Sequence, residues 1–333
     1  MSDQPHSPSA DLTLEQALNL AQSHWNAGQA QQAEQLCRQI LAVIPEQPHA
    51  LNLLGVIAHA YNQPDLALEL FRQACQAENA TANHLSNLAE MCRQKGLLDE
   101  ARQAGQRAVD CDPQLPTGWN NLGIILQESG LLEQSRECLQ RALAMQPESP
   151  EAHNNLANTY RRLNQVEQAA ALYQQALVLD PGYAEAHSNL AFLQASQGQF
   201  ELAEQSARRA IDLNPQLTDA YLNLAEAHSA RRQYAQALHW LDVLHSFAPH
   251  YIAGLTARAL LLHKLERLDE ARATAQQAVE LAPDNGNAHF TLGQIFQALH
   301  QHEQALIHFV RASELPGIHA KEALLAIQGV DAQ

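Results

Sequence analysis

Small apolar, large apolar and polar positions recur along the chain with a period of 34 residues. Proline marks one point of this lattice, and it ends helices because it lacks an amide hydrogen and clashes with the preceding turn. Taking that proline as position 32 of a 34-residue repeat gives nine repeats between residues 14 and 319. The lattice prolines are Pro45, Pro113, Pro147, Pro181, Pro215, Pro249 and Pro283.

Within the repeats, residues of one size fall into columns. Position 8 is always Gly or Ala, position 20 is Ala in eight repeats, and position 7 is Leu in all repeats except the one with Arg258. Antiparallel helices approach closely where the facing side chains are small. The columns therefore predict a first helix near positions 1–14 and a second helix near positions 15–30. Residues suited to a left-handed turn near position 15 are Gly28, Gly96, Gly130, Asn164 and Gly198.

These columns resemble the tetratricopeptide-repeat (TPR) family, whose 34-residue helix–turn–helix units carry the same small-residue and proline positions. The resemblance covers residues 14–319 and implies an all-α fold, a right-handed superhelical solenoid of TPR units. Residues 1–13 are expected to form a flexible tail, and residues 320–333 a partial capping helix and tail. An apolar side of that last segment would favour self-association through the carboxy-terminal edge. Its apolar residues are Leu324, Leu325 and Ile327.

The charge of the chain narrows the choice of partners. The formal net charge is −16, and an acidic chain repels phosphate groups, so neither nucleic acid nor an anionic membrane is expected as a partner. The first ten residues lack the basic start and apolar run of a signal peptide, and no apolar stretch approaches the roughly 20 residues of a membrane span. We expect a soluble, cytoplasmic protein. The five cysteines form no Cys-x-x-Cys pair and are expected to be buried and reduced.

A narrower resemblance concerns residues 27–74, which are similar to the amino-terminal repeats of bacterial proteins related to O-linked N-acetylglucosamine transferases. In those proteins the repeats select the protein substrate, and a following domain carries the chemistry. The sequence ends at residue 333 without such a domain, so the resemblance implies substrate recognition without transferase activity.

Motifs for catalysis are missing from the sequence. It contains no phosphate-binding loop, nucleophile elbow or His-Glu-x-x-His pair, so we expect no enzyme activity, no catalytic residue and no cofactor. His153, His187 and His289 share position 4 with Trp119 and Tyr221, which indicates packing residues. The histidines nearest the carboxy-terminal end can be interpreted either as solvated side chains or as a weak surface metal site. We favour solvated side chains and expect no bound metal. Those histidines are His300, His302 and His308.

The resemblance to TPR proteins implies that the first helices line a concave groove, with positions 2, 5, 6, 9, 12 and 13 facing it. Position 6 carries an unbroken run of asparagines, namely Asn87, Asn121, Asn155, Asn189 and Asn223. An asparagine amide offers a donor and an acceptor, so it can pair with the backbone of any peptide. Helices about 8–10 Å apart would grip roughly every third residue of an extended chain, which advances about 3.3 Å per residue. Further predicted groove residues are Asn120, Asn154, Asn158, Arg161, Arg162, Phe192 and Glu226.

Two functional hypotheses remain open. The first is a scaffold that binds a protein or an extended peptide in its concave groove. The alternative is the substrate-recognition arm of a glycosyl- or sulfotransferase whose catalytic domain is absent from this chain. An asparagine column is also common in TPR proteins of many functions, so it can be structural instead. Arg258 replaces a core leucine and is expected to reach solvent or to pair with an acid such as Asp219 or Glu226.

Overall fold

The computed structural model describes residues 12–315, 322–323 and 325–326, and all regular structure in these residues is α-helical. Successive first helices begin 34 residues apart, and so do successive second helices. The first helices are α1 (Leu14–Asn26), α3 (Pro48–Ala60), α5 (Ala82–Gln94), α7 (Pro116–Glu128), α9 (Pro150–Arg162), α11 (Ala184–Ser196), α13 (Thr218–Ala230), α15 (Ile252–Lys264) and α17 (Gly286–Ala298). The second helices are α2 (Ala30–Val43), α4 (Pro64–Gln76), α6 (Leu98–Cys111), α8 (Leu132–Met145), α10 (Val166–Leu179), α12 (Phe200–Leu213), α14 (Tyr234–Phe247), α16 (Leu268–Leu281) and α18 (His302–Glu314). In this described part of the chain, no helix is both long enough and apolar enough to span a membrane.

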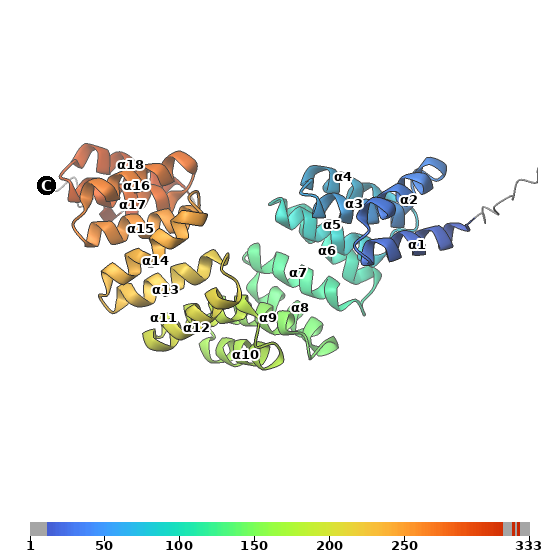
Figure 1. Ribbon diagram of the computed structural model, residues 1–333, viewed down its shortest axis with the longest axis horizontal. Helices are drawn as coiled ribbons and strands as arrows, with labels where there is room; N and C mark the ends of the chain where they lie inside the picture. Colours follow the sequence, from blue (N-terminus) through green and yellow to red (C-terminus); the bar gives the residue numbers. More distant parts are fainter. Residues whose placement is uncertain (1–11, 316–321, 324, 327–333) are drawn as a thin grey trace, which may run out of the picture. The chain divides into compact units, whose positions relative to one another are not determined.

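The chain divides after Gln165 into two compact bodies (Figure 1, blue to green and yellow-green to red). In each body a second helix packs against the first helix of the next repeat, as α2 does against α3 and α12 against α13. Consecutive first helices also touch, such as α5 and α7 or α13 and α15, whereas in the described residues consecutive second helices do not. Each body therefore curves with its first helices on the inner side. We call this inner surface of each body its concave face.

The backbone explains where the helices begin and end. The position-15 residues expected to be left-handed all have positive φ, from 59° at Asn164 to 78° at Gly130. The same conformation is imposed on residues of other types, including Arg232 and Glu266, because the turn has the same geometry in each repeat. Every second helix begins two residues after this turn, slightly later than the sequence predicts. The helix breaks expected at Pro147 and Pro181 are confirmed.

Three repeats show how a glycine in the first helix accommodates a large residue in the second. A Cβ atom added to Gly293 would lie 2.7 Å from the ring of Phe309, which is fully buried. The same arrangement joins Gly55 to Phe71 and Gly123 to Leu139, with distances of 2.6 and 2.5 Å. Atoms this close overlap sterically, so the glycine permits the short separation of the two helices. Repeat 7 has a different combination, with Ala225 at position 8 and Leu241 at position 24.

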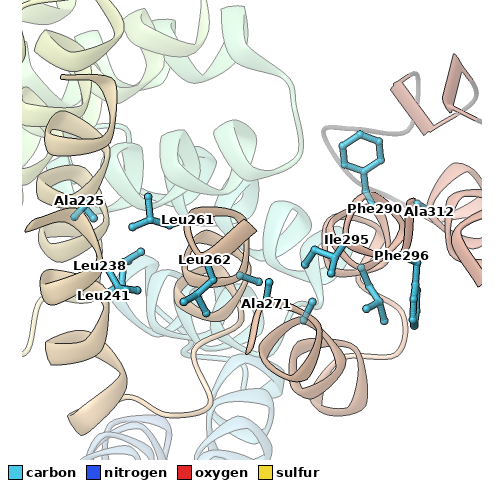
Figure 2. Packing of buried hydrophobic residues seen from close by; sticks show 14 of the residues in the cluster. Ala225, Leu238, Leu241, Leu261, Leu262, Ala271, Phe290, Ile295, Phe296 and Ala312 are labelled. Atoms are coloured by element: carbon cyan, nitrogen blue, oxygen red, sulfur yellow. The ribbon is translucent and has the colours of Figure 1, made fainter. Parts of the chain in front are cut away.

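A continuous core joins α13 to α18 in the carboxy-terminal body. Figure 2 shows part of it, with labelled side chains from α13 through α18, among them Leu241, Leu262 and Ile295. Ala323 is buried against the same core, whereas Leu325 is exposed. The predicted contacts of Leu324 and Ile327 lie outside the described residues. Self-association through this edge therefore stays a prediction, as do the expected chain divisions at residues 13 and 319.

Arg258 pairs with an acid, as expected, but the acid is Asp242 and not Asp219 or Glu226. Its Nε donates to Asp242 Oδ1 at 2.7 Å, and its Nη1 donates to Thr274 Oγ1 at 2.9 Å. Both acceptors lie on second helices, α14 and α16. Position 7 faces the second helices, where leucine packs in the other repeats. Asp219 and Glu226 instead lie on α13 at groove-facing positions 2 and 9.

The cysteines largely follow the expectation. Cys37, Cys75, Cys92 and Cys138 are buried, and burial raises the pKa of each thiol to about 11 or about 12. Thiolates are the reactive form of cysteine, so these four thiols are inert near neutral pH. Cys111 is exposed at the last residue of α6, and the expectation of burial is wrong for this residue.

Candidate binding site on the concave faces

The predicted groove residues all lie on first helices, and they fall into two sets. In the amino-terminal body they occupy three consecutive first helices, with Asn87 on α5, Asn120 and Asn121 on α7, and the others on α9. Those on α9 are Asn154, Asn155, Asn158, Arg161 and Arg162. In the carboxy-terminal body, Asn189 and Phe192 lie on α11, and Asn223 and Glu226 lie on α13. Each body thus carries its own segment of the asparagine column.

The asparagines at position 6 link consecutive first helices. Each of four donates its Nδ2 to the residue at position 5 of the preceding repeat, over distances of 2.9–3.0 Å for the shortest bond of each pair. The pairs, donor first, are Asn87 with Asn52, Asn121 with Ser86, Asn155 with Asn120, and Asn223 with Ser188. The column therefore has a structural role that the sequence did not reveal. We call these contacts the interhelical amide bonds.

The interhelical amide bonds leave part of each amide available. An asparagine side chain has two donor hydrogens and an oxygen with two lone pairs. The Oδ1 atoms of Asn87, Asn121 and Asn155 accept no hydrogen bond from any residue that the structure describes, and these side chains are only half-buried. The amino-terminal body thus presents three oriented acceptor oxygens, one on each of three adjacent helices.

Ion pairs neutralise part of the charge beside this column. Arg93 donates two hydrogen bonds to Glu90, at 2.8 and 2.7 Å, and another to Glu128 on α7. Burial favours the neutral acid, but the hydrogen bonds from Arg93 and Gln94 outweigh it and hold the pKa of Glu90 below its ordinary value. Arg93 is therefore held between carboxylates of α5 and α7.

The aromatic and histidine residues at position 4 support the scaffold instead of the groove. Trp119 Nε1 and the Tyr221 hydroxyl each donate at 3.0 Å to the carbonyl of the lattice proline six residues earlier. His187 and His289 make the equivalent contact through Nε2, at 3.2 and 3.0 Å. These bonds satisfy carbonyls just beyond the ends of second helices, where the helix itself supplies no donor. His153 differs, because its Nδ1 lies 2.9 Å from the carbonyl oxygen of Ser149.

The histidines at the carboxy-terminal end make ring contacts. His308 Nδ1 lies 2.9 Å from His289 Nδ1, and its ring stacks on Phe296. The rings of His300 and His302 meet edge to face, with their centroids 6.2 Å apart. Among the described residues no group of three or more His, Cys, Asp or Glu side chains is arranged to hold a metal ion.

A cavity of about 280 Å³ opens between α13 and α15 on the concave face of the carboxy-terminal body. Leu222, Leu260 and Leu261 are among its apolar walls, and Glu226 and Lys264 are its charged residues. Glu226 was predicted as a groove residue, but Leu260 and Lys264 were not. The sequence signal was present, since the asparagine column stops at Ala257, which also lines this cavity.

Comparison with protein families gives matches described as tetratricopeptide repeat along the chain. One family model matches residues 18–83, 62–116, 120–184 and 256–316, and two others match residues 172–205 and 194–261. No curated protein sequence gives a significant match.

Solved structures show the same fold. A tetratricopeptide repeat protein from Parabacteroides merdae ATCC 43184 is 22% identical, with a TM-score of 0.60 over 76% of this chain and 99% of that chain. A second match is to the APC/C hetero-tetramer Cut9–Hcn1, at 14% identity and a TM-score of 0.64. That alignment covers 93% of this chain and 61% of the other chain.

Proposed function

Because the chain belongs to the tetratricopeptide-repeat family, we propose that it is a protein-binding scaffold that holds an extended peptide on the concave faces of its first helices. Membership of this repeat family supports binding as the main activity. The observation that carries the proposal is the row of acceptor oxygens on Asn87, Asn121 and Asn155.

The interhelical amide bonds prepare these asparagines for a peptide. Because Nδ2 is bonded to the preceding first helix, the amide plane is held before a ligand arrives, and less side-chain freedom is lost on binding. Each Oδ1 can accept the amide hydrogen of a peptide bond regardless of the peptide's side chains. Adjacent helices packed about 8–10 Å apart would place successive contacts roughly three residues apart on an extended chain.

Replacing Asn121 and Asn155 together by alanine should weaken peptide binding about fivefold to hundredfold. Two hydrogen bonds would be lost, and each contributes about 0.5–1.5 kcal/mol. The probe is a set of unstructured peptides selected on the intact protein from a phage-displayed library, and affinity is measured by fluorescence anisotropy. Stability should fall only slightly, because alanine favours helix by several tenths of a kcal/mol and offsets part of each lost interhelical bond.

Ser86→Ala provides the matched control. It removes the acceptor of the Asn121 interhelical bond but leaves Oδ1 of Asn121 in place. We expect a similar change in melting temperature with a smaller loss of affinity than in Asn121→Ala, because Oδ1 remains but is no longer held in place. Equal losses of affinity in Ser86→Ala and in Asn121→Ala alone would show that the asparagines act only as scaffold. Failure of the library to yield any binder of the intact protein would refute the proposed function.

A second role rests on the resemblance of residues 27–74 to the repeats of O-linked N-acetylglucosamine transferase-like proteins. In that role the concave faces select a protein substrate for a glycosyl- or sulfotransferase domain. Reading the gene beyond codon 333 and the neighbouring reading frames separates the two roles. A transferase domain there would support the second role, and unrelated sequence would favour a stand-alone scaffold.

A further inference from the structure

The chemistry between consecutive first helices changes at one interface of the carboxy-terminal body. At the interfaces with interhelical amide bonds, positions 5 and 6 form polar pairs, such as Ser86 with Asn121 and Ser188 with Asn223. Between α13 and α15 the same two columns hold Leu222 and Ala257. Neither side chain can form an interhelical amide bond, and alanine fills less space than asparagine.

The cavity of about 280 Å³ lies at this interface. Behind Leu222 and Ala257, it is lined by Leu241 and Leu261, which are 3% and 4% exposed, and Leu260 forms a further wall. Small-molecule sites usually measure about 300–1,000 Å³ and enclose most of their ligand. This cavity falls just below that range and opens onto the concave face, so its size suits a single apolar side chain.

Glu226 supplies the charge beside the cavity. The glutamate at the same position of repeat 3, Glu90, is neutralised by Arg93, which lies one helical turn further along α5. Ser229 replaces that arginine in repeat 7, and Glu226 has no ion pair or hydrogen bond among the residues that the structure describes. Lys264 contacts the end of α13 instead, where its Nζ lies 3.5 Å from Ser229 Oγ.

Most of the surrounding formal charges have the same sign as Glu226. Groove-facing positions of α11, α13 and α15 add Glu185 and Asp219, against Lys264 and His263. Both added carboxylate residues are exposed, and the whole chain carries a formal charge of −16. A peptide with basic residues would therefore be attracted to this part of the concave face, and an acidic peptide would be repelled.

We propose that the cavity between α13 and α15 is an anchor pocket for one aliphatic or aromatic side chain of a bound peptide, and that this peptide carries Lys or Arg beside the anchor to pair with Glu226. The inference rests on the proposed function, since it specifies which peptides the concave face selects. Burial of the apolar anchor away from water supplies binding free energy. The ion pair of the basic residue with Glu226 fixes the direction and register of the peptide.

Selection of phage-displayed peptides on the intact chain tests the pocket directly. The selected peptides should share an apolar residue with Lys or Arg nearby. Ala257→Leu fills the cavity and should weaken their binding about tenfold to hundredfold, which corresponds to the loss of one buried apolar side chain. Glu226→Lys should weaken binding several-fold and should be rescued by peptides in which the basic residue is changed to Glu. Ala235→Leu adds the same group at an exposed site on the second helix α14, away from the concave face, and should have little effect.

A second variant covers the case in which Ala257→Leu does not fold. Ala257→Asn introduces the residue that other repeats carry at position 6, so it should fold and also narrow the pocket. Selected peptides without an apolar–basic motif, or affinities unchanged by both Ala257 variants, would refute the anchor pocket. The proposed function would still stand if Asn121→Ala with Asn155→Ala weakened those same peptides. A library that yields no binder at all would refute both.

Discussion

Replacing Phe309 by alanine should lower the free energy of unfolding of the last helix pair by about 3–5 kcal/mol, as expected for a large side chain removed from a fully buried site. Gly293→Ala should lower it by about 1–2 kcal/mol although alanine is the better helix former by about 1 kcal/mol. The added methyl would lie 2.7 Å from the Phe309 ring, so the two helices must separate. Hydrogen exchange of α17 and α18 measures the effect locally, since repeats unfold in part independently.

A double mutant shows whether the two residues act as a pair. Gly293→Ala with Phe309→Leu recreates the Ala225 and Leu241 combination of repeat 7, so its loss of stability should be smaller than the sum of the single losses. Gly105→Ala is the control, because its nearest contact would be the end of a leucine side chain at 3.2 Å, and it should be neutral or mildly stabilising. Additive losses in the double mutant would contradict a steric pair.

Lowering the pH from 7 to 5 should destabilise the amino-terminal body by about 2 kcal/mol through His84 alone. Burial, and secondly the neighbouring His49, lower the pKa of His84 from 6.5 to about 4. Between pH 6.5 and about 4, His84 is therefore protonated in the unfolded chain but neutral in the folded chain. The stability contributed by neutral His84 is therefore complete above pH 6.5 and is lost as the pH falls toward 4.

His84→Gln isolates this effect. His84 Nδ1 accepts the backbone N–H of Thr81 at 3.0 Å, and Gln16 does the same for Thr13 at the start of α1. Glutamine at position 84 should therefore keep the capping box without titrating. Urea unfolding between pH 7 and pH 5 should show a shallower loss of stability in the variant. Carboxylates with lowered pKa values, such as Glu90, titrate below this window. Parallel pH profiles for the variant and the original chain would show that His84 is not the titrating group.

The helices could be predicted from the sequence because their signals are local and repeated. Proline ends the helix before it whatever its surroundings, so Pro147 and Pro181 mark helix ends. Gly130 and Asn164 at position 15 indicate a left-handed turn by their residue type alone. Arg232 shows the limit of this reasoning. Its residue type does not favour positive φ, and the helices on both sides of the turn impose that conformation.

The site could be predicted only in outline. The positions of Asn121 and Asn155 in the repeat identified them as groove-facing. The interhelical amide bonds depend, however, on which residue of the preceding repeat lies opposite each asparagine. Donor and acceptor are 35 residues apart, and this separation is set by the packing of the helices. The ion pairing of Arg93 likewise depends on Glu128, a neighbour from the next first helix. The pocket required a comparison of two columns across an interface, where Leu222 meets Ala257.

The glycine–aromatic pairs also restrict how such a gene can recombine. A crossover in the loop between two repeats transfers Gly293 together with Phe309, so the number of repeats changes and each helix pair stays compatible. A crossover between the two helices of one repeat would join, for example, the first helix carrying Ala259 to the second helix carrying Phe309, and the extra methyl would overlap the ring. Recombinants of the first kind should therefore be more stable than recombinants of the second kind. A helix pair that begins at the first helix is therefore the unit that can be exchanged without a steric conflict at these glycines.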